Sequence, residues 1–170
     1  MAALDVRIRA AEPADADAVR RIYAAPAAQA GTLQLPYPTL DLWQQRLAGL
    51  GAGRHALVAE VDGEVVGQIG LYTQADTPRR AHVAGIGMGV RDDWQGRGIG
   101  GALLAAAIDL AERWLQVTRI EIEVYADNAA AIALYKKHGF VREGLHRRHA
   151  FRDGAYVDTL SMARLRPTQP

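Results

Sequence analysis

Seven residues near the middle of the chain have the composition of an anion-binding turn. Gln95-Gly96-Arg97-Gly98-Ile99-Gly100-Gly101 follows an apolar segment and a polar turn, and it precedes a segment with helical periodicity. Glycine costs about 1 kcal/mol relative to alanine inside a helix, so this many glycines indicate a turn whose backbone N–H groups stay accessible. The first N–H groups of a helix have no partner within it and lie at its positive end. The segment therefore predicts a site for a phosphate or diphosphate, to which Arg97 adds a charge.

Two elements must position this turn. We expect a strand at Ala81–Val90 and a helix at Gly98–Trp114, where Leu103, Leu110 and Trp114 recur at helical spacing. A glycine-rich surface loop without a ligand is the alternative interpretation. The strand–glycine–helix order favours the anion site.

The rest of the chain predicts a mixed sheet. We expect further strands at Val6–Arg9, Ala56–Val61, Glu64–Tyr72, Thr118–Tyr125, Val141–Phe151 and Ala155–Ala163, and helices at Glu12–Pro26, Thr39–Leu50 and Asp127–His138. Asp62-Gly63 and Asp153-Gly154 predict tight hairpins, and Gly139 predicts a helix end. Only one strand–helix–strand crossover results. The prediction is one α/β (α+β) domain over residues 1–170, with a mostly antiparallel seven-stranded sheet and about four helices.

Composition narrows the function classes. The 170 residues contain no cysteine and carry a net charge of +1. A disulfide framework, a thiolate nucleophile and a zinc–thiolate site are therefore excluded, and a nucleic-acid partner has no electrostatic support. The longest apolar run, Ala102–Leu110, is far below the roughly 20 residues of a membrane span, and the N-terminus does not resemble a secretion signal. We expect a cytoplasmic protein with neither nucleic acid nor membrane as a partner.

The glycines also fit a second enzyme class. Gly96, Gly98 and Gly101 have the spacing of the dinucleotide fingerprint, with Glu121 about 20 residues on. Against this, Arg91–Gln95 separates the first glycine from its strand. A single crossover also leaves no room for the two halves of a dinucleotide-binding fold.

Two motifs together resemble the GNAT superfamily of acyl-CoA-dependent N-acyltransferases. The first is Gln-x-x-Gly-x-Gly at Gln95–Gly100, and the second joins Asn128 to the run from Leu134 to Phe140, one strand further on. Their pairing is specific, and the likeness runs nearly end to end. Within the family, segments such as Thr32–Pro36 look most like bacterial L-amino-acid N-acetyltransferases, a branch akin to the phosphinothricin-type enzymes.

The resemblance implies acetyl-CoA as co-substrate, with no metal. It implies a cofactor cleft where the parallel strands Ala81–Val90 and Thr118–Tyr125 splay apart, with the pantetheine arm along the first strand. Gly85, Gly87 and Gly89 on that strand fit a bulge or a close ligand approach, or they only relieve packing. An N–H near Val90 could also steady an oxyanion. The expected cofactor contacts are Met88, Val90, Gln95, Gly96, Arg97, Gly98, Ile99, Gly100, Gly101, Asn128 and Tyr135, of which Asn128 equally fits a helix N-cap.

The catalytic acid implied by the resemblance is Tyr135, which would protonate the departing thiolate. A phenol of pKa about 10 and a thiol of about 8.5 leave this transfer roughly 2 kcal/mol uphill, which positioning can offset. A core aromatic beside Phe140 is the alternative. The base stays open, because the strand before the glycines lacks the family's usual carboxylate. Glu123 through water and His82 are the candidates, beside a water relay without a dedicated base.

The sequence says least about the acceptor substrate and the residues that bind it. In this family the loop corresponding to Gly31–Pro38 covers the acceptor, so Thr32, Gln34 and Tyr37, with His82, are the expected substrate-binding residues. Arg79 or Arg80 could pair with a substrate carboxylate. We expect the primary amine of a small molecule as acceptor, an L-amino acid or analogue. The alternatives are a protein N-terminus, a polyamine, an antibiotic, or a non-catalytic acyl-CoA sensor.

Two smaller expectations complete the prediction. His146 and His149 are three residues apart, so on a regular strand they point to opposite faces and form no metal site. A homodimer is expected because many relatives are dimers.

Overall fold

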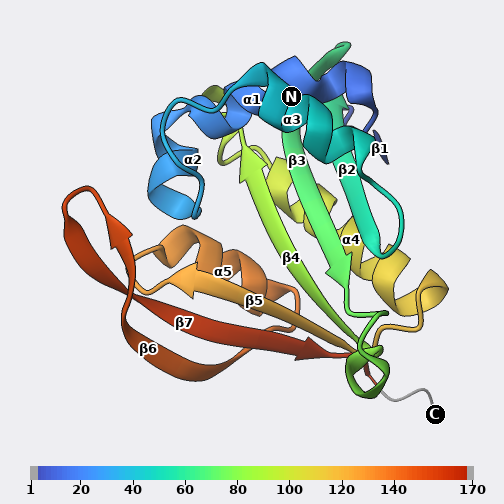
Figure 1. Cartoon of the computed structure of the whole chain (residues 1–170), viewed down its shortest axis with the longest axis vertical. Coiled ribbons are helices and arrows are strands. Elements are labelled where there is room, and N and C mark those ends of the chain that lie inside the picture. The colour runs from blue at the N-terminus through green and yellow to red at the C-terminus, as the bar shows by residue number, and fades with distance from the viewer. Residues whose placement is uncertain (1–3, 168–170) are drawn as a thin grey trace.

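A seven-stranded sheet forms the centre of the structure, a computed structural model that describes residues 4–167. Its strands are β1 (Arg7–Ala10), β2 (Arg54–Val61), β3 (Glu64–Thr73), β4 (Val83–Val90), β5 (Arg119–Tyr125), β6 (Val141–Arg152) and β7 (Ala155–Leu165). They lie in the order β1-β2-β3-β4-β5-β7-β6 (Figure 1), and β4 with β5 is the one parallel pair in this part of the chain. The predicted fold class is confirmed.

Five helices cover this sheet within the described residues, and four of them were expected. They are α1 (Ala16–Ala24), α2 (Pro26–Gly31), α3 (Leu40–Ala48), α4 (Ile99–Trp114) and α5 (Ala129–Lys137). The sequence predicted a single helix ending at Pro26. Instead α1 ends at Ala24 and α2 begins at Pro26, because proline suits a first helical position, where its missing N–H has no partner to lose. None of these helices has both the length and the apolarity needed to cross a membrane.

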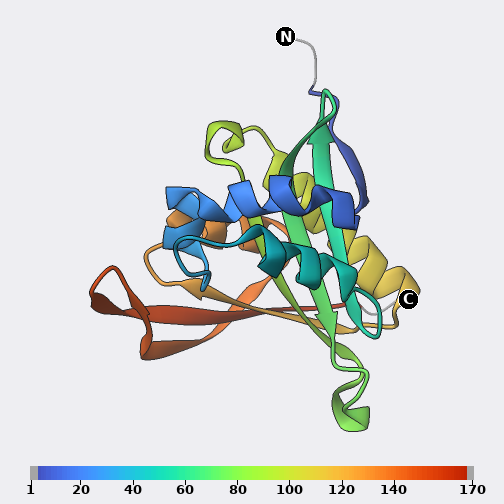
Figure 2. The same ribbon diagram turned by 45° about the horizontal axis from the view of Figure 1, so that its top comes forward.

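The sheet has a hydrophobic core on each face. On one face α4 buries Ile99, Leu103 and Leu104 against the sheet, where it packs on β2, β3 and β4. On the other face α1 and α3 pack over β2 and β3 (Figure 2), and α1 also contacts β4. Ile22 and Trp43 are among the side chains buried there. The two helix layers therefore fix β4 from both sides.

Parallel strands β4 and β5 separate soon after they meet. Their pairing covers only Val83–Gly85 against Arg119–Glu121. Beyond these residues β4 continues along β3 while β5 continues along β7, and the two strands diverge (Figure 1). The result is the splay that the family resemblance implied.

Candidate active site

The turn from β4 into α4 leaves backbone amides without partners. Gly98 adopts a left-handed conformation with φ of +85°, and a Cβ placed there would meet nothing within 4 Å. The Ala102 N–H donates to the Gly98 carbonyl at 3.0 Å, and no side chain caps the helix. The N–H groups before Ala102 therefore have no acceptor inside α4. The exposed Arg97 guanidinium lies over the Trp94 ring, 4.8 Å from its centroid.

Asn128 lies at the start of α5 and lines a cavity together with Gln95 of this turn. Its side chain accepts a hydrogen bond from the Ala131 N–H at 3.2 Å, so it is a helix N-cap. The cavity has a volume of about 770 Å³, and Thr32 lines it too. The structure thus brings two of the expected cofactor residues to one cavity.

A larger cavity of about 900 Å³ opens where β4 and β5 diverge. Its apolar wall includes Tyr23, Trp43, Tyr72, Met88, Ile122 and Met162. Its polar wall includes Arg46, Arg54, Arg119, Glu121, Glu123, Glu143 and His146. We call this space the acceptor cavity, because Thr32 and Gln34, two of the residues expected to bind the acceptor, line it. It lies on the α1–α3 side of the sheet, and Tyr135 reaches it from α5 on the other side.

Tyr135 is both a core residue and a cavity residue. It is 5% exposed, and its ring centroid lies 5.6 Å from that of Phe140. Its hydroxyl makes no hydrogen bond to any described residue, and burial raises the pKa of Tyr135 to about 12. Transfer of this proton to a thiolate of pKa about 8.5 is then about 5 kcal/mol uphill, more than the sequence suggested. Burial of the thiolate would reduce that difference, because desolvation raises the pKa of a thiol too.

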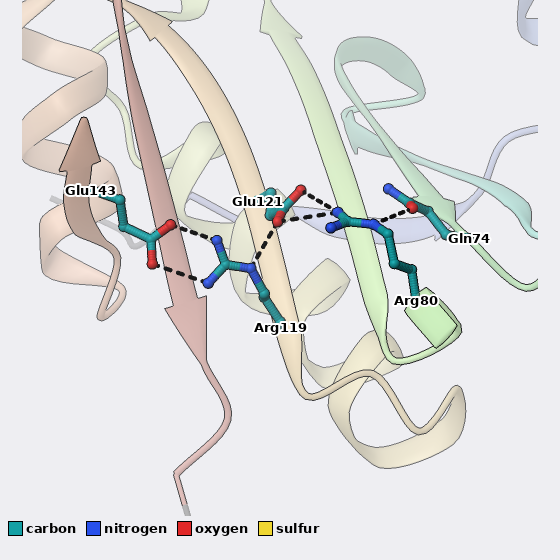
Figure 3. A network of polar contacts seen from close by, with 5 residues as sticks. All are labelled: Gln74, Arg80, Arg119, Glu121 and Glu143. Atoms are coloured by element: carbon teal, nitrogen blue, oxygen red, sulfur yellow. Dashed lines mark hydrogen bonds and ion pairs between the residues drawn. The ribbon is translucent and has the colours of Figure 1, made fainter. Parts of the chain in front are cut away.

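At the end where β4 and β5 are still paired, which we call the closed end of the splay, side chains form a continuous polar network (Figure 3). Arg119 donates to both oxygens of Glu143, at 3.0 and 2.5 Å, and its Nε donates to Glu121 Oε1 at 2.7 Å. Arg80 donates to Glu121 Oε2 at 3.1 Å and to Gln74 Oε1 at 2.7 Å. Arg119 holds the pKa of Glu143 below its usual range. Arg80 is therefore committed to Glu121, not free for a substrate carboxylate, and both carboxylates are neutralised.

Glu123 is the carboxylate in the acceptor cavity without an arginine partner among the described residues. Its side chain is 50% exposed, and its Oε2 lies 3.7 Å from His149 Nδ1. No arginine ion pair occupies its carboxylate oxygens, which leaves them accessible from the cavity. The geometry therefore favours Glu123 over Glu121 and Glu143 as the base.

The other predicted residues divide into two groups. Thr32 and Gln34 line the acceptor cavity, and the Arg46 guanidinium holds Gln34 Oε1 at 2.8 Å. Tyr37 and His82 line neither cavity. Tyr37 is 93% exposed, and His82 lies in the turn before β4, so we do not retain them as substrate-binding residues.

The glycines of β4 do not form the bulge that the sequence allowed. The β3–β4 register is continuous from Thr73 opposite Ala84 to Gly67 opposite Val90. Gly85 lines the acceptor cavity, and a Cβ placed on it would meet nothing within 4 Å. Its effect is to leave open the space that a larger side chain would fill. Val90 instead lies outside both cavities, and its carbonyl accepts from Gln95 Nε2 at 3.4 Å.

Sequence reasoning missed several cavity residues. Tyr23 and Trp43 carry no sequence signal of a binding site, yet their stacked rings, with centroids 4.7 Å apart, form one wall of the cavity. Arg46 and Arg54 carried no motif that could have identified them. The prediction that His146 and His149 face opposite ways is wrong, because their ring centroids are 4.9 Å apart. The cause is a bulge in β6 that the sequence pattern does not reveal.

These features together define a class of protein. A parallel strand pair that splays, bare amides at the start of the following helix, and a buried phenol at the splay are the parts of an acyl-CoA-dependent acyltransferase. The acetyltransferase (GNAT) family model matches residues 17–140. The chain therefore belongs to the GNAT family of acetyltransferases and is an N-acetyltransferase, as the sequence motifs predicted.

Individual relatives agree with this assignment. The chain is 44% identical over 162 residues to the L-amino acid N-acetyltransferase AaaT of Escherichia coli K12, covering 95% of this chain and 99% of that protein. A crystal structure provisionally assigned as a phosphinothricin N-acetyltransferase matches with a TM-score of 0.87 and 26% identity, over 96% of this chain and 100% of that one. The structure of yncA from Salmonella typhimurium, a provisionally assigned acetyltransferase determined with its cofactor acetyl-CoA, has a TM-score of 0.82. It is 25% identical, with 96% and 95% of the two chains covered.

Proposed function

We propose that this enzyme transfers an acetyl group from acetyl-CoA to the α-amine of an L-amino acid or a close analogue. The charge of the acceptor cavity carries this proposal. Arg46 and Arg54 line it without an ion pair to any described carboxylate, and Glu123 lines it without an arginine. A small molecule that has both a carboxylate and an ammonium group complements these charges. A polyamine, which has only cations, does not. The related AaaT is named for the same acceptor class.

The residues proposed to hold acetyl-CoA fit its chemistry. The free amides of Gly96–Gly101 and the Arg97 guanidinium offer donors and charge to a diphosphate. Beyond Gly85, β4 has no pairing partner on its β5 side in the described residues, so its backbone at Met88 and Val90 is available to the amides of a pantetheine arm. Asn128 lines the cavity of about 770 Å³ that Gln95 also lines.

The chemistry assigned to this chain is two proton transfers. Glu123, through a water molecule, removes a proton from the acceptor ammonium, so that the neutral amine attacks the thioester carbonyl. An N–H near Val90 steadies the oxyanion that forms. Tyr135 then donates its phenolic proton to the departing thiolate, and its hydroxyl has no hydrogen-bond partner among the described residues to compete for that proton. The nitrogen releases its second proton to water as the intermediate collapses to the amide, and the Tyr135 phenolate recovers a proton from water.

An acceptor panel tests this function. L-amino acids, the corresponding amino acid amides, spermidine and a peptide with a free N-terminus would each be supplied with acetyl-CoA while thiol release is followed. We expect at least tenfold higher kcat/KM for an amino acid than for its amide, because the amide lacks the carboxylate that Arg46 or Arg54 would bind. Faster turnover of spermidine or the peptide would overturn the acceptor class. Thiol release that no amine accelerates would indicate a non-catalytic acyl-CoA sensor.

Further expectations from the sequence remain proposals. We propose a cytoplasmic homodimer that needs no metal and binds neither nucleic acid nor membrane, in keeping with the absence of cysteine and the net charge of +1. Light scattering of the purified protein would test the dimer. Activity in the presence of a chelator would test the metal requirement.

A further inference from the structure

A strained bulge in β6 re-aims side chains beside the acceptor cavity. The β6–β7 register passes from His146 opposite Thr159 to Ala150 opposite Val157, so three residues of β6 face Asp158 alone. Within the bulge Arg148 has φ of +52°, and its N–H donates to Asp158 Oδ1 at 2.8 Å. A non-glycine residue in this conformation is unfavourable and persists where its surroundings hold it. Such bulges are common beside active sites, where they redirect a side chain.

The side chain redirected here is that of His149. Its Nδ1 lies 2.8 Å from the hydroxyl of Thr159, a residue only 4% exposed, and 3.7 Å from Glu123 Oε2. The ring of His146, which lines the acceptor cavity, packs against it. The His149 side chain is 39% exposed and so reaches solvent as well. No group of three His, Asp or Glu residues within 4–167 is arranged to hold a metal ion.

We propose that His149 is a positioning residue for Glu123, receiving the proton that Glu123 takes from the acceptor ammonium and releasing it to solvent. This inference rests on the proposed acetyltransferase reaction. The ammonium N–H bond breaks and a carboxylic O–H bond forms. Because Glu123 Oε2 and His149 Nδ1 are 3.7 Å apart, a water molecule carries the proton to Nδ1, where the Thr159 hydroxyl turns to accept from the new N–H, and the proton on Nε2 leaves to bulk water. Glu123 returns to its carboxylate form and His149 to its neutral form, so no further reactant is needed.

A carboxylate alone is a poor acceptor for this proton. An α-ammonium group has a pKa near 8 and a carboxylic acid one near 4.3, so the transfer is unfavourable by a factor of roughly 5,000. An imidazole is in general a stronger base than a carboxylate, so it accepts the proton more readily. The network at the closed end of the splay cannot help, because arginines already hold Glu121 and Glu143.

Chemical rescue tests the role of His149. In His149→Ala we expect kcat to fall about tenfold while the KM for acetyl-CoA stays within twofold. Added imidazole should restore at least half of the lost rate, because it can occupy the exposed space left by the ring. Unchanged kcat, or a loss that imidazole does not repair at any concentration or pH, would overturn the proposal.

A matched pair at Thr159 separates this role from a structural one. Thr159→Ser keeps the hydroxyl that orients the His149 ring, whereas Thr159→Val has the same shape without it. We expect the Val variant to lose about threefold in kcat with unchanged KM, and the Ser variant to match the wild type. Equal kcat for the two variants would contradict the proposed orientation.

An NMR titration needs no acceptor and so separates this inference from the proposed function. The acceptor cavity beside this pair is lined by the charged groups Arg46, Arg54, Arg119, Glu121 and Glu143, and by the titratable groups Tyr23, His55, Tyr72, Tyr135 and His146. With these unchanged, Glu123→Gln should move the titration of the His149 ring protons to lower pH, because a nearby anion is lost. If the curve does not move, the coupling is absent whatever the enzyme acetylates. If it moves in an enzyme that acetylates no amine, the pair stands and the proposed reaction fails.

Discussion

The two ends of the β4–β5 splay differ in how their polar groups are used. At the closed end, Gln74, Arg80, Glu121, Arg119 and Glu143 form one network in which each charged group has a partner (Figure 3). At the open end, the amides that begin α4 and the Tyr135 hydroxyl have no partner among the described residues. Arginine–carboxylate pairs at the closed end hold strands together, whereas the groups left free at the open end are available to a ligand.

This difference also explains why the negative charge of a glutamate does not by itself identify it as the general base of the reaction. Three glutamates line the acceptor cavity, but the bidentate contact with Arg119 lowers the pKa of Glu143 and makes it a weaker proton acceptor. Arg80 and Arg119 occupy the oxygens of Glu121, whereas no arginine occupies those of Glu123. If the comparison holds, changes at the open end should act on binding and turnover, and changes in the paired groups should act on stability.

The largest effect is expected at the glycine turn. Gly98→Asp places a carboxylate where the diphosphate would lie, whereas Gly98→Asn has nearly the same shape and no charge. Both residues must adopt the φ of +85° found there, which Asn and Asp tolerate better than other side chains. We expect calorimetry to show about 1,000-fold weaker CoA binding for Asp and about tenfold for Asn. Equal affinities for the two variants would remove the anion site from this turn.

The next largest effect is expected at the buried phenol. Tyr135→Phe removes the proton donor and keeps the ring that packs on Phe140, so kcat should fall about 100-fold while CoA affinity stays within threefold. Because burial raises the pKa of Tyr135 to about 12, the phenol stays protonated through pH 10. The wild-type rate should therefore not decline between pH 8 and pH 10 through loss of this proton. A decline there that is absent from Tyr135→Phe would contradict the high pKa.

A matched pair of glutamates on β5 sharpens the comparison directly. Glu123→Gln should lower kcat about 30-fold without changing the free energy of unfolding, because its carboxylate has no arginine to release. Glu121→Gln should leave kcat within about threefold and lower the free energy of unfolding by about 1 kcal/mol. Steady-state kinetics and urea denaturation measure the two effects. The opposite assignment of activity and stability would show that Glu121 is the base.

Much of the fold was predictable because local chemistry decided it. The sequence places both hairpin turns at Asp-Gly pairs, which adopt positive φ in the structure, and Gly139 ends α5 with φ of +82°. Thr39 caps α3 as expected, accepting from the Leu42 N–H at 3.2 Å. Each of these features depends on a few neighbouring residues.

The acceptor side was less predictable because distant segments build it. Arg46 comes from α3, Arg119 from β5 and His146 from β6, and no local pattern indicates that they share one cavity. The β6 bulge likewise depends on a contact between residues of different strands. It depends on Asp158 from β7 receiving the Arg148 N–H, so the strand pattern of β6 alone assigned His149 to the wrong face.

The smallest effect is expected in a paired group far from the splay. Arg9 donates to both carboxylate oxygens of Asp15, at 2.8 and 2.9 Å, and lowers the pKa of Asp15, which is buried. A lowered pKa means that Asp15 stabilises the fold above its unfolded value near 3.9 and that this contribution disappears as pH falls through the lower folded value. Asp15→Asn should therefore lower the free energy of unfolding by about 1 kcal/mol at pH 7, and the difference from wild type should shrink below pH 4. Urea titrations at pH 7, 5 and 3.5 measure this, with kcat expected to stay at the wild-type value. A difference that persists at acid pH would mean that packing, and not the charge of Asp15, is what the substitution removes.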